Sequence, residues 1–562
     1  MAADERFDAV VIGSGFGGAV TACRLAEAGW SVVVLERGRP WPPGSFPRTP
    51  RDFQQAFWDP AAGRYGMADI WSFSGMNVVT ASGLGGGSLI YSNVMLRKPA
   101  ATFEDSERER WPVTRAQLDV HYDRVQAVQA PQVYPLEHEP YAQTGRAQEL
   151  ARAARALGLE AERPPLAVLF AAADGADPVP RAPVVEEVVN LHGVPRTTCR
   201  LCGECNIGCN DGAKQTLDLT YLTRALAAGA QIRTLCEART LAASDGGWTV
   251  GYRQHVDGAE GVQARLRDPV ADAAAGTVHG AHVVLGAGTV GSVSLLLRNR
   301  PALPRLSRAI GRRVSGNGDL LSFARNARGG HPRDAERPWR YLDPSRGPAI
   351  TTSVHVPAER SESGREHYVQ DSGAPAFTEW MWQALELPED LWAARRMVWR
   401  RAKEKLTGRR DENISAELAT LMGSGRMSAA MMPLLGMGRD VADARLHRDD
   451  DGELDLEWDD RASRPHYDAL RATCGALSRA MGADWMPIRS AHLTTVHAVG
   501  GCAMAVNPAD GVVDPLGNVH GHPGLHVADG SVMPGPVGPN PSFTIAALAD
   551  RFAEAMIAGG RP

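Results

Sequence analysis

Phe7-Asp-Ala-Val-Val-Ile12, followed at once by Gly13-Ser-Gly15-Phe-Gly-Gly18, is the stretch that decides the fold of this chain. The apolar run has the length of a β-strand, and residues 19–30 have the one-sided apolar pattern of a helix. Residues 31–35 form a second apolar run that ends in Glu36. Strand, glycine turn, helix and strand in this order predict a βαβ unit that binds a dinucleotide.

The glycines and the acid of this unit have distinct roles in such a site. Gly13 permits the tight turn, Gly15 lets the backbone approach a pyrophosphate, and Gly18 lets helix and strand pack closely. The helix N-terminus offers free N–H groups to the phosphates. Glu36 follows Gly13 by 23 positions, where a carboxylate accepts hydrogen bonds from the adenosine ribose. Because that carboxylate would repel a 2′-phosphate, FAD or NAD is favoured over NADP.

A second glycine pattern occupies residues 281–291, with Gly286-Ala-Gly288 at its turn. It could mark a separate NAD site. Residues 298–313, however, contain two prolines and a run of arginines, and no second strand ends in an acid near position 310. We therefore expect a later strand and helix that return to the first sheet.

Composition narrows the class of protein. The chain has 562 residues, 44% hydrophobic and 22% charged, so two or three domains of ordinary globular composition are expected. Its net charge of −5 argues against nucleic acid as the main partner. No apolar run is long enough to span a membrane, and the first ten residues do not resemble a signal peptide. A cytoplasmic location is the expectation.

The C-terminal region adds chemistry. His497-Ala-Val-Gly-Gly-Cys502 offers a proton-transfer residue, Gly538-Pro-Asn540-Pro offers a neutral hydrogen-bonding residue on a stiff backbone, and Asp529-Gly530 is typical of a strand end. We expect both ends of the chain to build one cofactor site, and redox chemistry at a flavin to take place there.

Taken in order, these motifs resemble the glucose–methanol–choline (GMC) oxidoreductase family, and within it the bacterial cholesterol-oxidase-like branch. The matching segments are residues 7–38, 81–93, 282–298, 497–503 and 524–551. The resemblance implies a mixed α/β and α+β fold: a Rossmann-like FAD-binding domain and a substrate domain of sheet plus helices, in the two-domain architecture of p-hydroxybenzoate hydroxylase. The expected FAD-binding domain comprises residues 1–110, 195–318 and 492–562. The expected substrate-binding or cap domain comprises residues 111–194 and 319–491.

The resemblance also implies the site. Catalysis is expected from His497 as base and Asn540 as its neutral partner. The cofactor-binding residues expected are Gly13, Gly15, Gly18, Glu36, Gly85, Gly86, Gly87, Ser88, Asn93, Gly288, Asp529 and Gly530. FAD is expected to bind non-covalently, since residues 42–120 contain no histidine for a covalent link.

The expected activity is FAD-dependent oxidation of a bulky apolar alcohol, sterol-like or long-chain, to a ketone or aldehyde, with oxygen or another acceptor taking the electrons. One alternative is a dehydrogenase that passes electrons through an iron–sulfur cluster. Another is a lyase of the hydroxynitrile type, in which FAD is retained without being reduced. Cholesterol oxidases of this branch use a glutamate on the steroid ring, but Gln370 stands at the matching position and Asp371 follows it. Isomerase activity is therefore doubtful.

Four cysteines, Cys199, Cys202, Cys205 and Cys209, have the spacing of bacterial ferredoxin ligands, but Asn210 replaces the usual following proline. We weigh an iron–sulfur cluster, disulfides, and free thiols in a tight loop before Lys214, and favour the free thiols. No other metal site is expected.

Two further segments bear on the substrate. Residues 377–405 interleave tryptophans with arginines, which is typical of an ordinary helical cap or of a lid that transiently contacts a membrane surface. Residues 431–438 are apolar, and we expect them to be flexible and to line a hydrophobic pocket.

Overall fold

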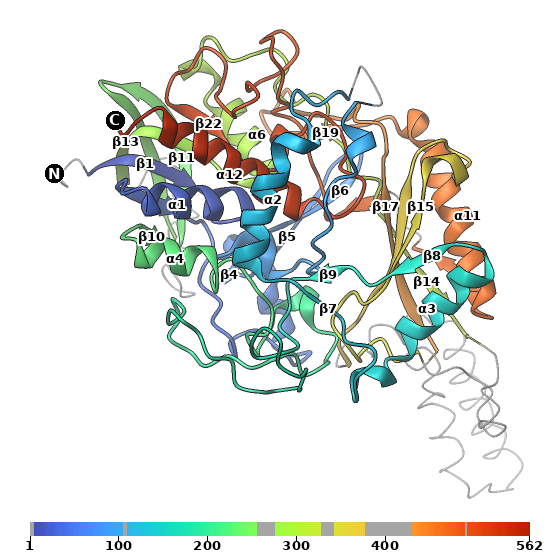
Figure 1. Cartoon of the computed structure of the whole chain (residues 1–562). Coiled ribbons are helices and arrows are strands. Elements are labelled where there is room, and N and C mark those ends of the chain that lie inside the picture. Colours follow the sequence, from blue (N-terminus) through green and yellow to red (C-terminus); the bar gives the residue numbers. More distant parts are fainter. Residues whose placement is uncertain (1–4, 105–108, 256–275, 328–341, 377–429, 489–491) are drawn as a thin grey trace, which may run out of the picture.

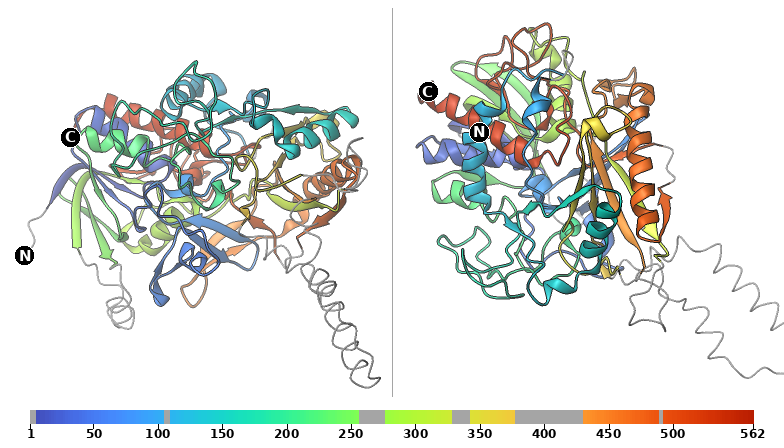
Figure 2. Two further views of the ribbon diagram at one scale, coloured as in Figure 1. Left: turned by 90° about the horizontal axis from the view of Figure 1, so that it is seen from below. Right: turned by 45° about the vertical axis from the view of Figure 1, so that its right-hand side comes forward.

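The structure is a computed structural model that describes residues 5–104, 109–255, 276–327, 342–376, 430–488 and 492–562. Two β-sheets lie in separate halves of the molecule (Figures 1 and 2). Both termini lie in the half that contains β1 and α12, on the left in Figure 1. The mixed fold expected from the sequence is confirmed.

The first sheet is the dinucleotide-type sheet. Its strand order is β10 (Gln231–Arg233), β2 (Val32–Leu35), β1 (Arg6–Ile12), β13 (Gly276–Leu285), β12 (Gly247–Gln254) and β11 (Cys236–Ser244), and β22 (Leu525–Val527) also pairs with β13. Its helices are α1 (Phe16–Glu27), α4 (Tyr221–Ala227), α6 (Gly288–Arg298) and α12 (Ser542–Ala558). The predicted βαβ unit is present. The second glycine pattern follows β13, a strand parallel to β1, and therefore belongs to the same sheet.

Four parallel strands of this sheet end at the same level. Ile12 is paired with Leu35 on one side and with Leu285 on the other. Leu285 is in turn paired with Val527. Ligands of open α/β sheets bind at the carboxyl ends of the strands, and the turns after β1, β2, β13 and β22 therefore share one edge.

The second sheet is antiparallel. Its strand order is β20 (Asp484–Pro487), β14 (Leu320–Arg325), β17 (Met432–Gly438), β16 (His367–Asp371), β15 (Ser353–Val356) and β8 (Glu160–Glu162). Helices α3 (Gly145–Ala156) and α11 (Arg464–Ala480) belong to this half, on the right in Figure 1. One face of the sheet, with Val369 and Leu434, packs in a core with Leu150 of α3 and Leu470 of α11. The other face is free to point away from these helices, since side chains alternate along a strand.

The remaining elements connect these two halves. They are helix α2 (Arg115–Gln129), one small three-stranded sheet and three short strand pairs. The three-stranded sheet consists of β21 (Thr494–Thr495), β6 (Asn77–Ala81) and β5 (Ala68–Ser72). The pairs are β3 (Trp58–Asp59) with β4 (Arg64–Tyr65), β7 (Gln132–Val133) with β9 (Pro165–Leu166), and β18 (Arg445–Arg448) with β19 (Leu454–Glu457). The domain boundaries expected from the sequence stay a prediction. Among the described residues, no helix combines the length and apolarity needed to cross a bilayer.

Two expectations about the substrate region have different outcomes. Residues 431–438 are not a flexible segment: Met432–Gly438 is β17, a strand hydrogen-bonded to β14 on one side and β16 on the other. Its composition, rich in Met, Leu and Gly, concealed the strand because the run lacks β-branched residues. The tryptophan-rich stretch, residues 377–405, lies outside the described residues.

The buried ion pair between Arg146 of α3 and Asp371 of β16 provides a test of the second half. Both side chains are fully buried. The Asp371 carboxylate also accepts the backbone N–H groups of Thr351 and Thr352 at 2.9 and 2.7 Å. Removing one partner of a buried pair leaves an uncompensated charge. We expect Asp371→Ala to lower the free energy of unfolding by about 3–5 kcal/mol.

Denaturant unfolding is the measurement, and Asp468→Ala is the matched control. Asp468 pairs with Arg471 on the surface, where its side chain is 72% exposed. The control should cost about 1 kcal/mol or less. Equal losses in the two variants would contradict the assignment of Arg146–Asp371 as a structural pair.

Candidate active site

Ser14, in the glycine turn after β1, connects three segments at the common strand edge. Its Oγ donates to Glu36 Oε2 at 2.6 Å and accepts the N–H of Gly85 at 3.0 Å. Its own N–H donates to the same Glu36 oxygen at 3.0 Å. Ser14 is completely buried. One hydroxyl therefore joins the first turn, the acid after β2 and the glycine loop at residues 85–87.

The glycines of this edge are required by close backbone contacts. A Cβ on Gly13 would lie 2.5 Å from the Gly286 carbonyl oxygen, and one on Gly18 would lie 2.0 Å from the Gly13 carbonyl oxygen. Gly86, with φ of +53°, would bring a Cβ within 2.6 Å of the Gly15 Cα. The turns after β1 and β13 and the loop at 85–87 are thus packed against each other without room for side chains.

The helix that follows the first turn leaves its N-terminus available. Gly15 is the N-cap of α1 and provides no side-chain cap. A Cβ on Gly15 would meet only one atom within 4 Å, and Gly87 and Gly288 have open space at that position. Uncapped N–H groups beside open space suit an anionic phosphate.

Two buried polar side chains of the loop after β6, Ser88 and Asn93, differ in their hydrogen bonding. Asn93, with φ of +70°, is fully buried, and neither atom of its amide has a hydrogen-bond partner in the described part of the chain. Ser88 differs, because its Oγ donates to the Gly85 carbonyl at 2.7 Å and accepts the N–H of Leu217 at 3.0 Å. Ser88 therefore supports the loop, whereas Asn93 is left with unused hydrogen-bonding groups.

Asp529, after β22, holds two segments together. Its carboxylate accepts the N–H of Gly288 at 2.9 Å, the N–H of Ser531 at 2.9 Å, and the hydroxyls of Ser292 and Ser531. Burial raises the pKa of this carboxyl, and the four donors oppose that rise. Because a carboxylate has about four acceptor positions, the side chain is already committed to α6 and to the turn at Gly530.

The His497 side chain is held by a carboxylate that sequence analysis did not single out. His497 Nδ1 lies 2.7 Å from Asp319 Oδ1, and the Asp319 side chain is 3% exposed. The second oxygen of Asp319 accepts the N–H of Val496 at 2.8 Å and the hydroxyl of Thr495 at 2.9 Å. Nδ1 is therefore the nitrogen that carries the proton, and Nε2, which has no partner among the described residues, can accept one.

Residues 315–319 connect this histidine to the turn that carries Asn540. Asn317 Oδ1 accepts the N–H groups of Val537 and Gly538 at 2.8 and 3.2 Å, and its Nδ2 donates to the Pro539 carbonyl at 3.1 Å. Asp319 of the same loop binds His497. A single five-residue loop thus holds both expected catalytic segments.

Asn540 contacts the second sheet through Gln370. Gln370 Nε2 donates to Asn540 Oδ1 at 3.0 Å, while Gln370 Oε1 is buried and has no partner in the described residues. Asp371 points to the opposite face, where it meets Arg146. Side-chain alternation along β16 therefore places Gln370, and not Asp371, beside the expected site.

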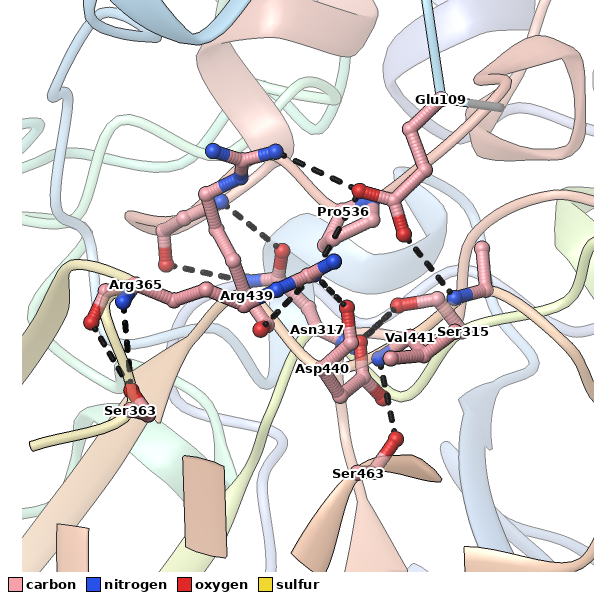
Figure 3. A network of polar contacts seen from close by, with 12 residues as sticks. Glu109, Ser315, Asn317, Ser363, Arg365, Arg439, Asp440, Val441, Ser463 and Pro536 are labelled. Atoms are coloured by element: carbon pink, nitrogen blue, oxygen red, sulfur yellow. Dashed lines mark hydrogen bonds and ion pairs between the residues drawn. The ribbon is translucent and has the colours of Figure 1, made fainter. Parts of the chain in front are cut away.

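A buried polar network supports the same loop from the second half (Figure 3). Glu109 lies 3.3 Å from Arg439 and accepts the N–H of Ala442. The neighbouring Asp440 accepts the hydroxyl of Ser315 and the N–H of Gly316. Burial raises the pKa of Asp440 to about 7. The loop at 315–319 is thus bonded on both sides.

The four clustered cysteines form a different kind of feature. All are free thiols, and in the described part of the chain no group of three or more His, Cys, Asp or Glu side chains is arranged to hold a metal ion. Burial raises the pKa of Cys202 to about 12 and that of Cys199 well above its usual value. These observations do not support the iron–sulfur cluster or the disulfides considered above.

Lys214 links the cysteine loop to the loop at 85–87. Its buried Nζ donates to the carbonyls of Cys205 at 2.8 Å and Leu89 at 3.0 Å. Burial lowers its pKa to about 7.

Comparison with known proteins identifies the family of this chain. Residues 189–312 and 476–549 match the two models described as GMC oxidoreductase, and residues 8–63 match a model described as FAD dependent oxidoreductase. The chain belongs to the GMC oxidoreductase family.

Individual relatives of this GMC oxidoreductase span nearly its whole length. It is 27% identical to a cholesterol oxidase of Mycobacterium tuberculosis (strain ATCC 25618 / H37Rv) over 97% of this chain and 90% of that protein. It is 26% identical to paromamine 6'-oxidase of Streptomyces fradiae over 98% of this chain and 92% of that protein. Its fold resembles the crystal structure of pyridoxine 4-oxidase from Mesorbium loti, with a TM-score of 0.55 at 17% identity, over 98% of this chain and 99% of that one.

This GMC oxidoreductase is an FAD-dependent enzyme that acts on alcohol groups. The residues present fit FAD. The uncapped start of α1 and the open space at Gly15 suit a pyrophosphate, and Glu36, placed after β2, suits a ribose. The unpartnered amide of Asn93 and the open space at Gly87 suit a polar ring edge beside the loop.

Ser14→Ala should weaken FAD binding, because it leaves the Gly85 N–H without its acceptor and removes one of the two donors to Glu36 Oε2. A lost buried hydrogen bond costs about 1–3 kcal/mol, so we expect FAD affinity to fall by about one to two orders of magnitude. Glu36→Arg should have a larger effect, since it puts a cation among N–H donors. The measurement is the ratio of flavin to protein absorbance after extensive dialysis.

Ser45→Ala is the control for this experiment. Ser45 Oγ donates only to the Pro42 carbonyl, on the exposed surface. Full flavin occupancy in Ser14→Ala and Glu36→Arg would show that this edge of the sheet does not hold the adenosine end of FAD.

Proposed function

We propose that this enzyme oxidises the hydroxyl group of a bulky apolar alcohol, sterol-like or long-chain, to a ketone or aldehyde, with His497 as the base. The observation that supports the proposal most directly is the pairing of His497 with Asp319 and of Asn540 with Gln370, both on segments held by one loop. Oxidation of an alcohol requires a group that accepts the hydroxyl proton, and histidine suits this task near neutral pH.

The two members of the pair have different roles in this proposal. With Nδ1 directed at Asp319, Nε2 of His497 is the acceptor of the hydroxyl proton, and the Asp319 carboxylate stabilises the imidazolium that forms. Asn540 Nδ2, which has no partner among the described residues, donates to the substrate oxygen and orients it. Bound FAD supplies the acceptor of the hydride.

Gln370 orients Asn540 and does not act as a base. Its donation to Asn540 Oδ1 turns the Nδ2 group of Asn540 away from β16. An amide cannot carry a proton between two positions of a steroid ring, so we propose oxidation without isomerisation.

The apolar character of the substrate is inferred from the free face of the second sheet. Gln370 is paired with Leu435, and Leu435 is paired with Leu321 of β14. Paired residues of adjacent strands point to the same side. Leu321 is 38% exposed, and Leu435 is partly buried. Two leucine side chains, Leu321 exposed and Leu435 partly buried, therefore lie on the Gln370 face of the sheet.

Cholesterol oxidase and paromamine 6'-oxidase are both named as oxidases, which favours molecular oxygen as the electron acceptor. Their names also indicate different substrates, cholesterol and paromamine. The two leucines favour an apolar substrate, because their side chains offer no hydrogen bonds to a polar one.

Anaerobic stopped-flow reduction with a sterol, a long-chain primary alcohol and paromamine tests the proposal. We expect the flavin absorbance to bleach with one of the two apolar alcohols. Bleaching with paromamine alone would overturn the apolar assignment, and turnover of a cyanohydrin without bleaching would identify a lyase. Leu321→Gln should raise KM for the apolar alcohol, whereas Val185→Gln, at a position that is 89% exposed, should not.

His497→Ala should slow flavin reduction by about two to four orders of magnitude, the range for loss of a positioned general base. Asn540→Ala should slow it less, because it removes orientation and not a proton acceptor. FAD binding should survive both changes, since the phosphates are expected at the turn at Gly13–Gly18. Near-normal reduction in His497→Ala would mean that another group accepts the proton.

Asp319→Asn should retain FAD but slow flavin reduction by about one to two orders of magnitude, because the amide cannot stabilise the imidazolium that forms on His497. Anaerobic stopped-flow reduction is the measurement. Normal reduction in Asp319→Asn would contradict this role of Asp319. Asp468→Asn, on the surface of α11, is the control.

A further inference from the structure

A cavity of about 300 Å³ lies between the end of α6 and β18, separate from the residues of the active site. Its lining residues are Leu297, Arg300, Arg308, Ile310, Arg312, Arg445, Leu446 and His447. α6 and β19, the partner strand of β18, lie near one another in the upper part of Figure 1. The cavity thus uses the arginine-rich residues 298–313, for which the active site has no role.

The walls of this cavity are held by backbone contacts. Leu446 N–H donates to the Gly311 carbonyl at 2.8 Å, and Val314 and Ala444 exchange hydrogen bonds of 3.0 and 3.2 Å. Gly311 has φ of +77°, and a Cβ there would lie 1.9 Å from the Leu446 carbonyl oxygen. The segment with Arg308 and Arg312 is therefore fixed against the strand with Arg445.

The lining of the cavity is rich in positive charge. Across the described residues, the exposed side chains of Arg300, Arg308, Arg312 and Arg445 form no hydrogen bond or ion pair. No acidic side chain lines the cavity. Two acids of the adjacent strand β19 are register partners of cavity residues, Glu457 of Arg445 and Asp455 of His447.

His447 provides an additional observation. It lines the cavity, and its Nδ1 is buried without a hydrogen-bond partner in the described part of the chain. Buried polar atoms are normally satisfied by protein, water or a ligand. Four guanidinium groups and a histidine ring thus line one space.

We propose that this cavity binds a phosphate ester or pyrophosphate group carrying at least two negative charges. The planar guanidinium fork matches phosphate oxygens in a bidentate manner. Four arginines exceed what a single carboxylate would neutralise. Leu297, Ile310 and Leu446 provide an apolar floor for the uncharged part of the ligand. A cavity of 300 Å³ is at the lower end of the size of small-molecule sites.

The test is calorimetric titration of the FAD-saturated enzyme with pyrophosphate at low ionic strength, where exposed charges are least screened. FAD must remain bound so that the probe cannot enter the cofactor site. We expect one site with Kd of about 1 mM or lower, weakened about tenfold or more in the double variant Arg308→Gln/Arg445→Gln. The control variant is Arg461→Gln, whose side chain is 79% exposed on another surface.

A second arm distinguishes a free phosphate ester from a lipid headgroup. Sedimentation with phosphatidylglycerol vesicles, compared with phosphatidylcholine vesicles, detects the headgroup. Pyrophosphate binding or phosphatidylglycerol-dependent sedimentation that the double variant loses supports the site and names its source. Absence of both at about 10 mM ligand, or binding that the double variant retains, would overturn it.

Discussion

The close approach of three backbone segments at the carboxyl edge of the first sheet is the constraint on which the rest of the structure depends. A side chain at Gly13, Gly18 or Gly86 would overlap a neighbouring backbone atom, so these segments pack at main-chain distance. The contact brings the turns after β1 and β13 and the loop at 85–87 to one place. Ser14 then joins the turn after β1 to Glu36 and to the loop at 85–87 by buried hydrogen bonds. The carboxyl edge of the first sheet therefore depends mainly on close backbone packing that leaves no room for side chains, and hydrogen bonds add to this packing.

The loop at residues 315–319 positions the two expected catalytic residues, His497 and Asn540. It is bonded to the His497 segment through Asp319 and to the Asn540 turn through Asn317. Neither catalytic residue lies on a helix or a strand of the two sheets, so their positions depend on such bonds. Lys98 adds a further bond, since its fully buried Nζ donates to the Pro536 carbonyl at 3.2 Å. Positioning of the pair is thus distributed over both halves of the molecule.

Sequence analysis could predict the parts of this arrangement that are local in the chain. The βαβ unit, the glycine turns and the return of β13 each have a pattern within about thirty residues. Asp319, Asn317 and Ser14 were missed, because each acts on residues that are distant in sequence; Asp319 and His497 are 178 positions apart. Only the oxygen-rich Ser-Gly-Asn-Gly-Asp run at 315–319 offered a local signal. β17 was missed for a different reason, since its side chains are apolar on both faces and give no alternation.

Gln370 and Asp371 are adjacent in sequence but have different roles: Gln370 contacts Asn540, and Asp371 forms a structural ion pair with Arg146. Adjacent positions on one strand face opposite sides, and the side that packs on α3 contains the only compensating cation, Arg146, that Asp371 contacts in the described residues. A carboxylate turned toward Asn540 would need its own partner in a buried site, and β16 offers none there. An amide needs no such partner: it can donate to Asn540 and keep its oxygen for a ligand. The neutral Gln370 therefore occupies the position at which a buried charge would have no partner. The charged Asp371 occupies the position at which Arg146 neutralises it.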